Sequence, residues 1–293
     1  MLYAATPTPR FDAVSLLVAR GFWMLPLFLV LAAVTRPKQR WSLGGRDALL
    51  FLACGVAFGP GACALAALGA SATSAAHFVL LVSLFPPLAG GLAALFLRER
   101  LAPVRVVAIL VGVVGASTLA LSKSTGGATP SGDLLVAAFI AAWALLTVGI
   151  RLLNRTYPPL FVVGVFGAVG SLLLALLGIP SGRMGAVLVP LQHFDTRTVL
   201  CFDVEIILLL SLVAQLLQGL ALRTLNVALV AALTSYGSIF AGLAASFLVL
   251  GERLTTGDVV ASAFLVTAVA LSLLPESLFR RRALAQPSVP PDG

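Results

Sequence analysis

Nine runs of about 20 mostly apolar residues follow one another along the chain, separated by short polar segments. A helix needs about 20 apolar residues to cross a bilayer. Lipid cannot satisfy the backbone hydrogen-bonding groups, so such segments form helices. The predicted spans lie at residues 12–34, 47–68, 72–97, 103–122, 133–153, 158–179, 204–223, 226–250 and 257–275. The predicted fold class is therefore all-α, a polytopic transmembrane helix bundle of about nine spans.

The composition supports lipid as the solvent of this chain. It is 60% hydrophobic and only 10% charged, whereas a soluble domain carries about 25% charged residues. A soluble protein this apolar could not cover its surface. The net charge of +8 does not indicate nucleic acid, because the cations fall in short clusters between apolar runs and form no basic domain. The bilayer is the expected partner, and nucleic acid is not.

The cations are distributed unequally between the two sets of loops. Thirteen of them fall on one side, namely Arg36, Lys38, Arg40, Arg46, Arg98, Arg100, Arg105, Arg151, Arg155, Arg223, Arg280, Arg281 and Arg282. Five fall on the other side, namely Arg10, Lys123, Arg183, Arg197 and Arg253. Cytoplasmic loops carry the excess of Lys and Arg. We therefore expect a multi-pass protein of the plasma or inner membrane, with its N-terminus outside and its C-terminus in the cytosol.

A short motif recurs along the chain. A shift of 153 residues aligns Arg98-Glu99-Arg100-Leu101 with Gly251-Glu252-Arg253-Leu254. An odd number of predicted spans separates the two motifs, so they face opposite sides of the membrane. Such inverted-topology repeats are common in secondary transporters, where one repeat rocks against the other around a site near the midplane.

The motif spacing divides the chain into two predicted units and a tail. Residues 1–125 form a first unit of four spans, and residues 126–279 form a second unit of five. Residues 280–293 are polar and proline-rich, which predicts a disordered cytosolic tail. The opening helix of the first unit is therefore expected to be absent. A start site assigned too late is the favoured explanation, and a genuine truncation is the alternative.

Three segments resemble the drug/metabolite transporter superfamily, in particular its EamA-type members. They are Val18-Ala19-Arg20-Gly21-Phe22, the block from Ala66 to Leu101 with Pro86, and the block from Ala221 to Leu254. The resemblance covers most of the chain. It implies ten helices in two inverted five-helix units, cytosolic termini and a central substrate cavity. The chain departs from this pattern by one helix, and Ile239 stands at the position that matches Pro86.

Polar residues within spans are candidate substrate ligands, because an unpaired polar group there is costly. Arg20 is expected to attract an anionic or polar substrate group, or else to reach the outer interface. His77 lies near the outer end of its span, where it is a candidate substrate ligand or pH sensor, or an interfacial hydrogen-bonded histidine.

Five further residues complete the candidate substrate site, namely two glutamines, a serine, a tyrosine and a tryptophan. Gln215 and Gln218 are three residues apart and so share a helix face; they either line a polar interior or join helices by hydrogen bonds. Ser235, Tyr236 and Trp143 lie near the middle of their spans, where they either wall a substrate cavity or pack between helices.

The sequence predicts no metal, cofactor or catalytic residue. The cysteines show no metal-binding spacing, and His193, Asp195 and Asp203 match no ligand motif. The predicted function is transport of a small polar or amphipathic metabolite by alternating access, with a homodimer as an option. The alternatives are a membrane-embedded enzyme, for which the residues around 193–205 are the only opening, and a truncated, non-transporting membrane protein.

Overall fold

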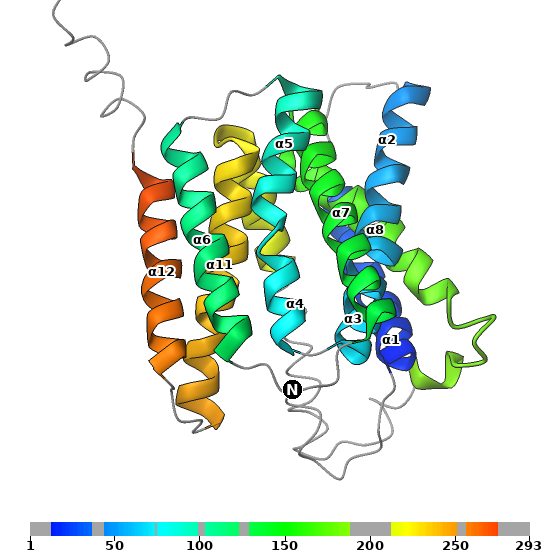
Figure 1. Cartoon of the computed structure of the whole chain (residues 1–293). Coiled ribbons are helices and arrows are strands. Elements are labelled where there is room, and N and C mark those ends of the chain that lie inside the picture. Colours follow the sequence, from blue (N-terminus) through cyan, green and yellow to red (C-terminus); the bar gives the residue numbers. More distant parts are fainter. Residues whose placement is uncertain are drawn as a thin grey trace, which may run out of the picture.

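The described part of the chain is helical throughout. The computed structural model describes residues 13–36, 44–73, 75–98, 103–122, 129–187, 212–250 and 256–274. Within these ranges every regular element is a helix, and Figure 1 shows the helices side by side in one bundle. The predicted all-α class is confirmed for these residues.

Several of these helices have the length and composition of membrane spans. Within the described ranges, four are long and apolar enough to cross a bilayer, namely Leu17–Val34, Gly45–Ala72, Pro130–Leu153 and Pro159–Leu176. Shorter apolar helices cover Phe85–Leu97, Pro103–Thr118, Val227–Phe240 and Val259–Ser272. These features are compatible with a membrane protein.

The first half of the described chain contains a long helical segment with a π-helical turn in its middle. Its elements are α1 (Ala13–Val34), α2 (Gly45–Val56), the π-helix η2 (Ala57–Ala64), α3 (Leu65–Ala72), α4 (Ala75–Val82), α5 (Phe85–Leu97) and α6 (Pro103–Ser122). The elements α2, η2 and α3 form one continuous segment. Its wide middle turn contains Pro60, which has no N–H to donate and therefore interrupts the regular ladder.

The second half begins with a capped helix. Its elements are α7 (Pro130–Leu153), α8 (Pro159–Leu176), the 3-10 turn η3 (Met184–Val187), a helix at 212–224, α11 (Val227–Leu250) and α12 (Thr256–Leu273). The Thr129 hydroxyl accepts a hydrogen bond from the Gly132 amide at 3.1 Å. This contact satisfies one of the free N–H groups at the start of α7. Pro130 occupies the first turn, where its missing N–H costs nothing.

The predicted span 72–97 is broken into α4 and α5 by a turn at Ser83 and Leu84. Pro86 cannot donate to the Val82 carbonyl four residues before it, so the helical ladder loses a bond there. The Ser235 hydroxyl of α11 donates to that carbonyl at 3.1 Å. A side chain from a distant part of the sequence thus replaces the missing backbone donor, which is how proline breaks are tolerated in membrane helices.

The most extensive helix pairs are α1 with α8 and α6 with α12. In the first pair, Gly21 approaches Ala175 and Gly164 approaches Ala32, so the two helices run antiparallel. A Cβ added at Gly21 would lie 2.5 Å from the Ala175 nitrogen, which allows only glycine at this backbone distance. Figure 1 shows that α6 and α12 also run in opposite directions.

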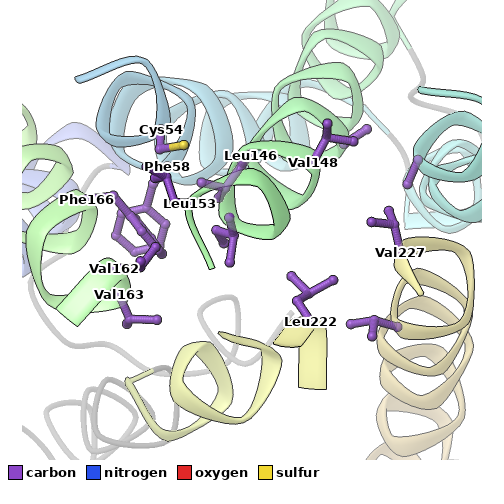
Figure 2. Packing of buried hydrophobic residues seen from close by; sticks show 14 of the residues in the cluster. Cys54, Phe58, Leu146, Val148, Leu153, Val162, Val163, Phe166, Leu222 and Val227 are labelled. Carbon is purple, nitrogen blue, oxygen red and sulfur yellow. The ribbon is translucent and has the colours of Figure 1, made fainter. Parts of the chain in front are cut away.

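The largest buried cluster lies around α7 and α8. Figure 2 shows its side chains meeting between α2, η2, α7 and α8, with Leu222 at the end of the helix 212–224 beside them. The Phe58 ring packs edge-on against Phe28 at 5.9 Å and Phe166 at 5.5 Å. Aromatic edges therefore fix η2 against both α1 and α8.

Candidate substrate site

One of the predicted polar residues, Gln218, lies at the contact between α7 and the helix 212–224. Gln218 Nε2 donates to Thr147 Oγ1 at 3.4 Å, and Thr147 in turn donates to the Trp143 carbonyl at 2.8 Å. Thr147 and Gln218 are buried. Gln218 therefore makes the interhelical hydrogen bond that the sequence offered as one of its two roles.

Gln215 lies one turn before Gln218 and has a different environment. Its buried Oε1 atom accepts no hydrogen bond among the described residues. The Arg151 guanidinium donates to the Leu222 carbonyl. Asn154 Nδ2 also donates to the Gly219 carbonyl at 2.8 Å. The C-terminal end of α7 therefore lies against the last two turns of the helix 212–224.

A row of aromatic rings runs from α4 through α7 to α5. Phe78 stacks on Phe139 at 6.1 Å, and Phe139 packs against Trp143 at 5.3 Å. Phe85 then stacks on Trp143 at 4.9 Å with an angle of 28° between the rings. Phe85 is fully buried, whereas Trp143 is half-buried. The row ends at Phe85, directly after the break between α4 and α5. The row of aromatic rings therefore lies next to the interrupted backbone.

Ser235 and Tyr236 both bond to backbone carbonyls of other helices. Ser235 bonds to Val82 at the α4–α5 break. The Tyr236 hydroxyl donates to the Ile109 carbonyl of α6 at 3.0 Å, and its side chain is fully buried. A Cβ at Gly112 would lie 2.1 Å from the Tyr236 ring, so the ring fills space that only glycine leaves. Both residues tie α11 to its neighbours, and their predicted part in substrate binding stays a prediction.

Arg20 lies on α1, away from the aromatic row. Its guanidinium lies within electrostatic reach of the Cys63 thiol in η2. The opposite side of η2 faces α7, where a Cβ at Gly61 would meet Ala142. The segment η2–α3 therefore separates Arg20 from Trp143. His77 lies on α4, and its side chain is outside the described part of the structure.

Sequence reasoning missed Thr147 and Phe85. Thr147 follows Trp143 by one helical turn, so the i, i+4 spacing was a usable signal. Phe85 immediately precedes Pro86, but nothing in the sequence indicates that its ring stacks on Trp143. The pairing depends on how α5 crosses α7, which is a property of the packed bundle.

A second polar contact joins the loop after α7 to the start of α2. The Tyr157 hydroxyl donates to Asp47 Oδ2 at 2.7 Å. Burial, together with the hydrogen bond and the negative charge of Asp47, raises the pKa of Tyr157 to about 12. Near this contact, Arg151 bonds to the last turn of the helix 212–224, where a cation is favoured by the free carbonyls.

The described residues contain no group of three or more His, Cys, Asp or Glu side chains that could hold a metal ion. The residues considered in the sequence for such a cluster, His193, Asp195 and Asp203, lie outside the described part of the chain. Cys54 is buried in the main apolar cluster and packs as a small hydrophobic residue.

Comparison with known proteins identifies a fold but no function. No protein-family model and no curated protein matches the chain. A solved crystal structure of another protein superposes with a TM-score of 0.67, covering 93% of this chain and 92% of the other at 19% sequence identity. A likeness at this identity shows a shared fold alone.

Proposed function

We propose that this chain is a polytopic membrane transporter that moves a small polar or amphipathic metabolite by alternating access. In this proposal it spans the membrane about nine times as two inverted units, with its N-terminus outside and its C-terminus in the cytosol. The support comes from the apolar helices, the way they pair and the polar groups placed among them.

The helix boundaries support the two-unit arrangement. The shift of 153 residues that aligns the sequence motifs carries Pro103, the first residue of α6, onto Thr256, the first residue of α12. It also carries Leu97, at the end of α5, onto Leu250, at the end of α11. The helices α6 and α12 pack antiparallel, as expected of equivalent elements that meet across a two-fold axis in the membrane plane.

The hydrogen bond between Ser235 and Val82 is the single observation that carries the proposal. The two residues are 153 positions apart, so in a two-unit chain they occupy equivalent positions. Equivalent positions can touch only on the axis that relates the two units. That axis would then pass through the break between α4 and α5, and broken helices near such an axis are typical of transporter substrate sites.

The groups near the break suit a small molecule with a flat apolar part and a hydrogen-bond donor. Trp143 is only partly buried, and Gln215 offers an acceptor without a partner among the described residues. We propose that Trp143 and Gln215 contact the substrate directly, whereas Gln218, Ser235 and Tyr236 hold the surrounding helices. No contact in the described structure favours the enzyme alternative.

Transport is tested with the purified full chain in proteoliposomes. Uptake of candidate metabolites from a pooled extract is measured by mass spectrometry, followed by counterflow of each hit. Gln215→Leu and Trp143→Ala should lower uptake about tenfold or more, since each removes a direct contact. Thr118→Ala is the control, because Thr118 bonds only to its own helix. If no metabolite is moved, or if both variants transport like the control, the proposal fails.

A further inference from the structure

Two hydrogen-bond donors on α1 have no acceptor among the described residues. Trp23 Nε1 is buried without a hydrogen-bond partner. Arg20 is half-buried, and the structure records neither a hydrogen bond nor an ion pair for it among the described residues. The two residues are three positions apart, so their side chains are neighbours on the helix surface. Both side chains can only donate, so they cannot satisfy each other.

These donors lie at the border between the bundle interior and an exposed apolar face. On the inner side, Arg20 is within electrostatic reach of Cys63. On the outer side, the Phe22 ring packs edge-on against Trp23 at 5.7 Å. Phe22 is 44% exposed and Leu27 is 42% exposed. A molecule bound to the donors would therefore also meet apolar side chains.

The position of Arg20 along α1 makes its unpaired charge more costly. Arg20 is seven residues after the first residue of α1, or about 10 Å along the helix axis. An unpaired cation inside a span is costly, and so is a buried N–H group without an acceptor. An oxyanion would satisfy both, because the guanidinium fork matches carboxylate and phosphate oxygens and the indole N–H needs one further acceptor.

We propose that Arg20 and Trp23 form a binding site for the oxyanion of an amphipathic molecule, a phosphate or a carboxylate. The oxyanion accepts hydrogen bonds from both residues, and the apolar part lies along Phe22 and Leu27. An anionic phospholipid and a soluble amphipathic acid share this chemistry. The site is separated from Trp143 by η2–α3, and the inference does not depend on the proposed transport activity.

The test uses the purified full chain in a non-ionic detergent. Three probes are titrated, namely phosphatidylglycerol, diacylglycerol with the same acyl chains, and octanoate, and binding is followed by the change in melting temperature and by native mass spectrometry. Trp23→Phe keeps an aromatic ring, although a smaller one, and removes the indole N–H, and Arg20→Gln removes the charge. Arg36→Gln is the matched control, because Arg36 is an exposed cation just beyond the end of α1.

Phosphatidylglycerol or octanoate should bind the wild-type chain, and diacylglycerol should not stabilise it. Trp23→Phe should weaken binding about tenfold, because one hydrogen bond to a charged group is lost. Arg20→Gln should weaken binding further, and Arg36→Gln should change it little. Binding of the phospholipid alone would identify a lipid site, and binding of octanoate would identify a site for soluble acids. Equal affinity in wild type and Trp23→Phe, equal stabilisation by diacylglycerol, or no binding of either anion would overturn the inference.

Discussion

The substitution Ser235→Ala should destabilise the folded chain only while Pro86 leaves the Val82 carbonyl without a backbone donor. In the wild-type chain the Ser235 hydroxyl is the donor to this carbonyl. Interhelical hydrogen bonds in membranes contribute about 0.6 kcal/mol on average and up to about 1.7. A buried acceptor left without a donor costs about 1–3 kcal/mol. We therefore expect Ser235→Ala to lower the free energy of unfolding by about 1–1.5 kcal/mol.

The second substitution, Pro86→Ala, restores a backbone N–H four residues after Val82. In that background the carbonyl has its own donor, so Ser235→Ala should cost less than about 0.5 kcal/mol, giving a coupling energy near 1 kcal/mol. Reversible unfolding in mixed micelles measures all four corners of the cycle. Ser238→Ala, which removes a bond within α11 only, is the control. Equal costs of Ser235→Ala in both backgrounds would refute the idea that the serine compensates for the proline.

Two further predictions concern the loop after α7 and the contact of α1 with α8. Because Tyr157 has a pKa raised from 10.0 to about 12, its contribution to stability is complete below pH 10 and is lost as the pH rises from 10 to 12. Tyr157→Phe should remove this pH dependence. Since Asp47 is half-buried, the substitution should also lower the free energy of unfolding by about 1 kcal/mol at neutral pH. A wild-type chain whose unfolding curve does not change between pH 8 and 11.5 would contradict this prediction. Gly21→Leu should prevent α1 from packing on α8 and abolish a monodisperse folded peak in detergent, whereas Gly91→Leu should be tolerated, because a Cβ there meets nothing within 4 Å.

The helices could be predicted because their signal is local. The predicted span 103–122 coincides with α6. The predicted span 257–275 begins one residue after the first residue of α12 and extends two residues past its last residue, Leu273. Apolar length is sufficient for this, since a segment in lipid has to bond its own backbone. The shared face of Gln215 and Gln218 was predictable for the same reason, because it follows from helical spacing alone.

The contacts between helices could not be predicted from the sequence. The prolines near residue 86 were visible, but nothing nearby indicates that a serine in another helix bonds to the Val82 carbonyl. Tyr236 likewise reaches Ile109, which is 127 residues away. Both contacts depend on the crossing of α11 with its neighbours. A polar residue in the middle of a span therefore indicates that a partner exists, but only the packed bundle shows whether that partner is a backbone carbonyl or a ligand.

In the proposed two-unit arrangement, the bond between Ser235 and Val82 also bears on how the two units diverged. The two positions now differ, since one supplies a hydroxyl and the other a carbonyl at an interrupted backbone. If the units arose by duplication, the serine and the proline break are complementary specialisations of once-equal halves. An exchange of the two segments between units should then be accepted only when both are exchanged together.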